Sequence, residues 1–166
     1  MPAQPVLTET ELAETPTAVR AWTRLLRAQA STVRLLSAQL QREHGLSIND
    51  YEALYFLSRA DGQRMKRVDL ARRLGLTPSG VTRLLEGLEG AGHVERAACD
   101  SDLRVTYAQL TTGGAEKLKS ASCGHIAAVC ELMEAHLTDS ELEGLSETLG
   151  KLPGVADGDD ACPAAD

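Results

Sequence analysis

The chain has 166 residues and a formal net charge of −7, with 43% hydrophobic and 25% charged residues. These values are ordinary for a globular domain, and they exclude collagen-like, mucin-like and wholly disordered chains. No apolar run approaches the roughly 18 residues that a membrane span needs, and residues 1–14 lack the pattern of a secretory signal. Four widely spaced cysteines without a CxxC pair predict a cytoplasmic protein with reduced thiols, and no motif indicates a metal site or a cofactor.

The first predicted element is a long amphipathic helix. Residues 1–15 look irregular and are expected to be flexible. From Thr17 to His44, apolar residues recur at steps of three and four, and Gly45 follows. Ser47 and Asp50 then have the spacing of a capping box, which predicts the start of a second helix.

The third and fourth predicted helices form a candidate helix-turn-helix. The second helix stops near Gly62, and the third covers residues 67–74 and ends at Gly75. Thr77 is a good N-cap and Pro78 suits the first position of the fourth helix. A tight turn between two helices, with a glycine that can adopt a positive φ, is typical of this motif.

After Gly92 the apolar period changes from a helical to a strand period. Residues 94–96 and 105–109 predict two short strands, joined by the polar residues 99–102. A helix-turn-helix followed directly by a β-hairpin is a winged helix. The fold class is therefore mainly α with a small β-hairpin wing.

The last predicted elements are two helices and an acidic tail. Thr111 or Thr112 begins a fifth helix, and a capping box at Thr138 and Glu141 begins a sixth, which Pro153 ends. The resulting division is a flexible N-terminus at 1–15, dimerisation helices at 16–46 and 112–152, a winged helix-turn-helix at 47–111 and a disordered acidic tail at 153–166.

The distribution of charge marks the winged helix as the part that meets a polyanion. Residues 59–104 hold nine Lys or Arg against seven Asp or Glu, whereas residues 105–166 hold three against eleven. The N-terminal end of the fourth helix can enter the major groove of double-stranded DNA. The expected contacts there are Thr77, Ser79, Gly80, Thr82 and Arg83.

Residues 68–85 resemble the helix-turn-helix of the MarR family of transcriptional regulators, and residues 88–96 resemble its entry into the wing. Asp102-Leu103-Arg104 resembles the wing signature of the family, an Asp-Arg-Arg run ahead of a Leu-Thr. The resemblance implies that Arg104 enters the minor groove and that Asp102 braces it, and Arg96 is a further expected DNA contact. Leu103 departs from the family pattern, and the loss of this cation is expected to weaken the contact of the wing with DNA.

The resemblance also implies a homodimer formed by the outer helices, which carry apolar stripes that one small domain leaves uncovered. Family members commonly bind a small, often aromatic, effector between these helices and the winged helix. Candidate residues for such a cleft are Trp22, His44, Tyr51 and Tyr55, with ordinary packing as the alternative.

The sequence thus predicts a sequence-specific DNA-binding regulator, most simply a repressor that a small ligand releases from a pseudo-palindromic operator. The alternatives are a winged helix that docks protein and a thiol-based redox sensor using Cys99. No catalytic set is recognisable, so an enzyme is not expected. Cys123 and Cys130 are expected to be small buried residues.

Overall fold

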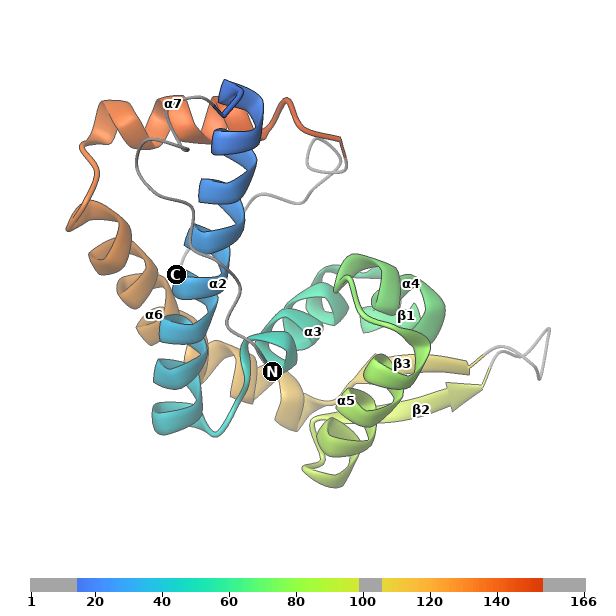
Figure 1. The fold of residues 1–166 in the computed structure, drawn as a ribbon. Coiled ribbons are helices and arrows are strands. Elements are labelled where there is room, and N and C mark those ends of the chain that lie inside the picture. Colours follow the sequence, from blue (N-terminus) through green and yellow to red (C-terminus); the bar gives the residue numbers. More distant parts are fainter. Residues whose placement is uncertain (1–14, 99–105, 154–166) are drawn as a thin grey trace, which may run out of the picture. The chain divides into compact units, whose positions relative to one another are not determined.

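The computed structural model describes residues 15–98 and 106–153. These residues are mainly helical with one small antiparallel sheet (Figure 1), which confirms the predicted fold class. The contacts divide the chain into two compact units, Met1–Leu35 and Leu36–Asp166, which are described separately below. Among the described residues, no helix is both long enough and apolar enough to cross a membrane.

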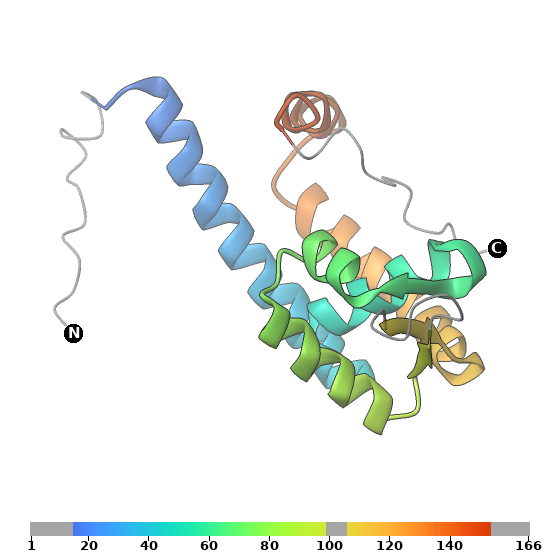
Figure 2. The same cartoon turned by 90° about the vertical axis from the view of Figure 1, so that its right-hand side faces the viewer.

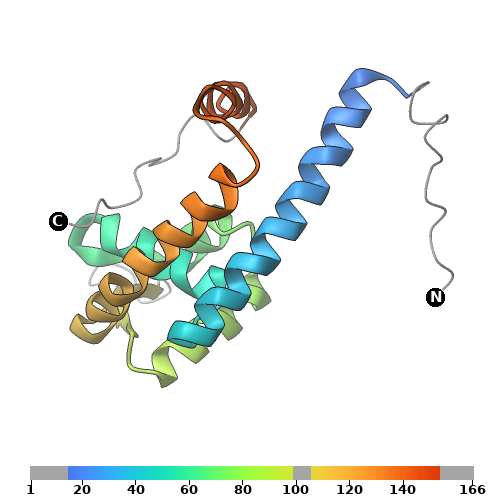
Figure 3. The same cartoon turned by 90° about the vertical axis from the view of Figure 1, so that its left-hand side faces the viewer.

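Helix α2 (Thr17–His44) is a single unbroken helix of 28 residues, as predicted (Figure 3). It ends where Gly45 adopts a φ of 67°, a conformation that a glycine reaches without steric cost. In the part of α2 that belongs to the first unit, no side chain is buried. Trp22, the largest apolar residue there, is 59% exposed.

Helix α3 (Ile48–Arg59) begins with the predicted capping box. The hydroxyl of Ser47 accepts a hydrogen bond from the Asp50 N–H, and the Asp50 carboxylate accepts one from the Ser47 N–H at 2.8 Å. The helix ends at Arg59, earlier than predicted, because a 3₁₀ turn, η1 (Asp61–Gln63), occupies the stretch around Gly62.

Strand β1 (Arg64–Lys66) was not predicted. It is only three residues long, which is too short for its polar-apolar-polar pattern to indicate a strand, and only its middle residue, Met65, is partly buried. The strand is held by pairing with a distant segment, which a local pattern does not reveal.

Helices α4 (Arg67–Arg73) and α5 (Pro78–Gly90) form the helix-turn-helix. Ala71 and Val81 are buried at the positions expected for a close helix approach, and Gly75 has a φ of 62° in the turn between the helices. The two-helix unit is therefore built as the sequence predicts.

Strands β2 (Val94–Ala98) and β3 (Thr106–Leu110) confirm the predicted hairpin. The sheet has the order β1-β3-β2, with Val94 opposite Leu110 and Met65 opposite Ala108. Helix α5 packs beside β2, as Figures 1 and 2 show. Residues 99–105, which separate the two strands in the sequence, lie outside the described residues.

Helix α6 (Thr112–Glu134) is capped by Thr111 and is joined tightly to the end of α5. The Thr111 hydroxyl accepts a hydrogen bond from the Gly114 N–H at 3.0 Å and donates one to the Gly92 carbonyl at 2.7 Å. A Cβ at Gly114 would overlap with the His93 carbonyl oxygen, so only glycine allows this approach.

Helix α7 (Asp139–Leu149) begins with the predicted capping box of Thr138 and Glu141, whose carboxylate accepts the Thr138 N–H at 2.9 Å. It ends at Leu149, before the predicted stop at Pro153. None of its side chains is buried. The predicted tail lies, apart from its first residue, outside the described residues.

The hydrophobic core lies in the second unit and joins α3, α4, α5, α6 and the sheet with the last turns of α2. Its largest fully buried side chains are Leu40, Leu54, Leu57, Leu70 and Leu85.

Candidate nucleic-acid interface

The N-terminal end of α5 is the exposed end of the helix-turn-helix. Thr77 is its N-cap: its backbone is extended and its hydroxyl accepts a hydrogen bond from the Gly80 N–H at 3.1 Å. Pro78 occupies the first turn, where its missing N–H costs nothing. The positive end of the helix dipole thus faces solvent, as an interface for DNA phosphates requires.

Three other predicted contacts follow along the same end. Ser79 is exposed, and its hydroxyl lies 3.1 Å from that of Thr77. The Thr82 hydroxyl donates to the Pro78 carbonyl at 2.8 Å, which fixes its rotamer. Arg83 is exposed one residue later. The structure therefore gathers the hydroxyl groups and one arginine on the solvent side of the first turns of α5.

Gly80 has a local structural role. It is half-buried, and a Cβ there would lie 3.2 Å from the Thr77 hydroxyl oxygen and 3.6 Å from the Leu76 Cβ. A side chain would therefore press on the N-cap itself. This packing explains the glycine without any contact with DNA, although both requirements can hold at once.

Arg96 is held by an ion pair with α5. Its Nε donates to both carboxylate oxygens of Glu89, at 3.0 and 2.8 Å. The pair joins the middle of β2 to the last turns of α5, and the Glu89 side chain is only 21% exposed. Arg96 thus positions the base of the wing against the recognition helix, a role that its place in the sequence did not reveal.

The predicted wing contacts and the candidate redox cysteine fall between strands β2 and β3 in the sequence. Asp102, Leu103 and Arg104, together with Cys99, lie outside the described residues. The roles expected for them stay predictions.

Arg67, at the start of α4, is a residue that the sequence analysis did not single out. It is half-buried, and its Nη2 atom is buried with no hydrogen-bond partner in the described part of the chain. Buried guanidinium nitrogens are usually paired. The only signal in the sequence was its membership of the basic segment 59–104. By contrast, Arg72 on the same helix already pairs with Asp69 at 3.0 Å.

The four candidate cleft residues have different surroundings. Trp22 lies on the exposed part of α2 in the first unit, and His44 is half-buried at the C-terminal end of that helix. Tyr51 and Tyr55 are one turn apart on α3. Tyr55 is half-buried, with its ring centroid 5.8 Å from that of Phe56. The structure does not test the predicted cleft, which stays a prediction.

Tyr51 is part of a buried polar cluster between α3 and α6. Its side chain is 4% exposed, its hydroxyl donates to the Ser122 hydroxyl at 3.3 Å, and its ring centroid lies 4.5 Å from that of His125. His125 is itself buried, and its Nδ1 has no hydrogen-bond partner in the described residues. Burial lowers the pKa of the His125 imidazole below its usual 6.5, because the charged form loses its hydration.

The prediction for two cysteines is wrong. Cys123 and Cys130, expected to be small buried residues, are both exposed on α6. They lie seven residues apart and so share one face of the helix, but this face points away from the core that Leu118 and Ala121 enter.

Comparisons with known proteins agree with this geometry. Residues 44–104 match the model of the MarR family, which covers α3, the helix-turn-helix and the start of the wing. The HTH-type transcriptional repressor YetL of Bacillus subtilis is 32% identical over 108 residues, which are 65% of this chain and 64% of YetL. The match therefore spans just under two thirds of that curated relative.

Two solved structures extend the likeness to most of the chain. AbsC, a MarR family transcriptional regulator from Streptomyces coelicolor, is 30% identical, with a TM-score of 0.73 over 93% of this chain and 97% of AbsC. Sco3205 from the same organism, solved in complex with DNA, is 28% identical, with a TM-score of 0.73 over 89% of this chain and 88% of its own. The chain therefore belongs to the MarR family of transcriptional regulators.

Proposed function

We propose that this protein is a sequence-specific DNA-binding regulator that reads the major groove with the N-terminal end of α5. The single observation that carries this proposal is the exposed helix end itself. Thr77, Ser79 and Arg83 face solvent there, on a helix that a buried core and the Arg96–Glu89 pair hold in place. Hydroxyl groups and a helix N-terminus suit phosphates, and arginine suits guanine.

Two relatives support this assignment. Sco3205, with the same fold at 28% identity, was solved in complex with DNA, and YetL is a transcriptional repressor. We infer from YetL that repression is the mode of action. The net charge of −7 does not oppose DNA binding, since the acidic excess lies after residue 104.

The proposal includes a homodimer. Several apolar side chains on the first unit and at the C-terminal end of the described chain are exposed to solvent. Association with a second copy of the chain would bury them in an interface. These side chains are Val19, Trp22, Leu26, Leu35, Leu145 and Leu152. A two-fold dimer would present two α5 helices to half-sites one DNA turn apart, about 34 Å.

Release from DNA by a small effector completes the proposal. Such a ligand acts by favouring a dimer whose α5 helices no longer match the spacing of the operator. Trp22, His44, Tyr51 and Tyr55 remain the predicted cleft. Of these, Tyr51 has its hydroxyl and one ring face engaged by Ser122 and His125, so a ligand there would have to compete with both.

The test is a fluorescence-anisotropy titration with labelled DNA from upstream of the protein's own coding region, with unrelated DNA as competitor. Arg83→Ala is expected to weaken binding by about 5- to 150-fold, which corresponds to the roughly 1–3 kcal/mol of one good arginine contact. Repeating the titration at two salt concentrations separates the loss of a phosphate contact, which lowers the salt dependence of binding, from the loss of a base contact, which lowers the sequence specificity.

Two matched variants sharpen the test. Glu86→Gln removes an exposed carboxylate one turn after Arg83 and is expected to tighten binding. Lys119→Ala removes an exposed cation on α6 and is expected to change little. Native affinity in Arg83→Ala would exclude this helix end as the reading surface. A dimer that binds no specific DNA would point instead to the docking of a protein.

A further inference from the structure

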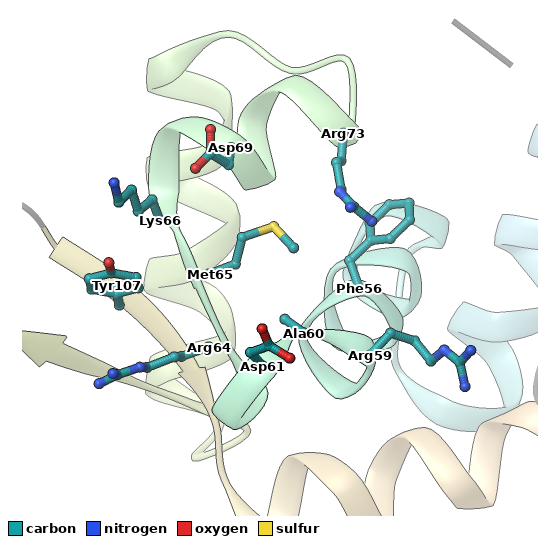
Figure 4. Close-up of a pocket in the computed structure, with 10 residues that line it drawn as sticks. All are labelled: Phe56, Arg59, Ala60, Asp61, Arg64, Met65, Lys66, Asp69, Arg73 and Tyr107. Carbon is teal, nitrogen blue, oxygen red and sulfur yellow. The ribbon is translucent and has the colours of Figure 1, made fainter. Parts of the chain in front are cut away.

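A pocket of about 400 Å³ opens beside β1, between the end of α3, helix α4 and strand β3 (Figure 4). None of the residues that line it belongs to α5 or to the predicted DNA contacts. None belongs to the predicted effector cleft. The pocket is therefore a separate feature of the winged helix. Its size is within the range of sites that hold small organic molecules.

The floor of the pocket is apolar. Phe56, Ala60 and Met65 are each half-buried and contribute rings or aliphatic groups to it. Figure 4 shows the Met65 thioether directed toward Phe56, between α3 and α4. A thioether adapts its shape easily and packs well against flat aromatic groups. The floor thus suits a hydrocarbon body rather than a hydrated ion.

The walls of the pocket are cationic. Four cations, Arg59, Arg64, Lys66 and Arg73, line it against two carboxylates, Asp61 and Asp69. Asp69 is moreover paired with Arg72, which does not line the pocket, at 3.0 Å. The excess of positive charge favours an anion.

Two of the arginines lie over aromatic rings. The Arg64 Cζ lies 5.2 Å from the centroid of Tyr107, and the Arg73 Cζ lies 5.5 Å from the centroid of Phe56. Stacking restrains a guanidinium group in one plane, so less freedom is lost when it binds a ligand.

The α4 helix places its charged residues along the pocket. Asp69 and Arg73 are four residues apart and so share one face of α4, and Lys66 is the N-cap residue directly before the helix. The Leu70 and Ala71 side chains of the same helix are buried in the core. Figure 4 shows Lys66 and Arg73 on opposite sides of Met65. An acid group can therefore meet a cation at either end of the apolar floor.

We propose that this pocket binds a small organic anion with a flat apolar body. Lys66 holds the acid group, Phe56 and Met65 contact the body, and Arg73 at the other end of the floor adds positive charge. The proposal goes beyond DNA binding and does not depend on it. Lys66 is the decisive residue, because it is exposed and its side chain makes no capping hydrogen bond to α4, so its replacement leaves the fold intact.

The experiment is a titration of the ¹⁵N-labelled full chain with 2-naphthoate, followed by NMR. We expect a Kd of roughly 0.1–1 mM for a ligand of this size. The amide shifts should centre on residues 56–66 and on Tyr107. 2-Naphthamide, which has the same body without the charge, and inorganic phosphate, which has charge without the body, should each bind at least about tenfold more weakly.

The variants locate the anion. Lys66→Gln should weaken 2-naphthoate binding about tenfold and Arg73→Gln by less, whereas Lys119→Gln, an exposed cation on α6, should change it less than about twofold. Equal binding of 2-naphthamide, shifts centred around Tyr51 and His44, or full affinity in Lys66→Gln would each overturn the proposal. Loss of DNA affinity in Lys66→Gln without any binding of 2-naphthoate would assign these cations to the DNA backbone instead.

Discussion

The winged helix and the first half of α2 are both built from leucine-rich helical sequence, but they use their apolar residues differently. In the winged helix, Leu54, Leu70 and Leu85 have no exposed surface. In residues 17–35, every side chain is at least partly exposed, and Leu26 is 48% exposed. A region with its own core is stable by itself, whereas an uncovered apolar stripe is a surface for association.

The largest effect is expected for truncation inside the core. Leu54→Ala should lower the free energy of unfolding by about 2–5 kcal/mol, because it removes buried methyl groups and leaves a cavity. The measurement is urea unfolding followed by circular dichroism. A loss below about 1 kcal/mol would mean that this core is not close-packed.

The exposed stripe should respond through association rather than through folding. Leu26→Glu places a charge beside the exposed Val19 and Trp22 and should weaken self-association at least about tenfold, with an unchanged helical spectrum. Light scattering over a range of concentrations measures it. Ser31→Glu adds the same charge on the opposite face of α2 and is the matched control. If both variants weakened self-association equally, the apolar stripe would not be part of the interface.

A smaller effect is expected at the junction of α5 and α6. Gly114→Ala should destabilise the fold by about 1–3 kcal/mol, because the new Cβ meets the His93 carbonyl and lies 2.8 Å from the Leu110 Cδ1. Gly144→Ala on α7 has nothing within 4 Å of its Cβ and should instead stabilise slightly, by up to about 1 kcal/mol. Thermal unfolding of the two variants measures whether each substitution raises or lowers stability. Destabilisation by both variants would contradict the packing argument.

The smallest effect is a dependence on pH at His125. Its pKa is lowered in the folded state by burial, so the unfolded chain takes up a proton first as the pH falls. Stability is therefore complete above about pH 6.5 and is lost toward the lower folded pKa, by at most about 1.4 kcal/mol per pH unit. His125→Phe should flatten the unfolding free energy between pH 7.5 and 5.5.

The matched control is His136→Gln, which removes an exposed histidine and should keep the slope. Glu52, whose pKa is raised by burial, contributes with the opposite sign near its own pKa, and it is present in all these variants. An unchanged slope in His125→Phe would show that other groups set the pH dependence.

The sequence was informative wherever a structure depends on neighbours along the chain. The capping boxes at Ser47 and Thr138, the turn at Gly75 and the N-cap at Thr77 all follow from local spacing, and the structure confirms them. These motifs satisfy backbone groups within three or four residues, so a local pattern contains the whole interaction.

The features that the sequence did not reveal depend on distant partners. Strand β1 exists because residues 64–66 pair with residues 107–109. The ion pair of Arg96 and Glu89 joins a strand to a helix, and the exposure of Cys123 depends on which face of α6 the core selects. The pocket beside β1 likewise gathers side chains from four successive elements and from Tyr107 on β3.

The close approach that glycine allows at position 114 also bears on how α5 and α6 are coupled. Gly114, in the first turn of α6, approaches the His93 carbonyl closely, and the N-cap Thr111 donates a hydrogen bond to the Gly92 carbonyl. The end of α5 and the start of α6 are therefore in direct contact through these residues. Helix α6 is 23 residues long, about 35 Å, and extends away from this contact. We therefore expect a tilt of α6 to move the end of α5 with it, because these contacts join the two helices directly. The orientation of α5, the proposed DNA-reading helix, would then follow the orientation of α6.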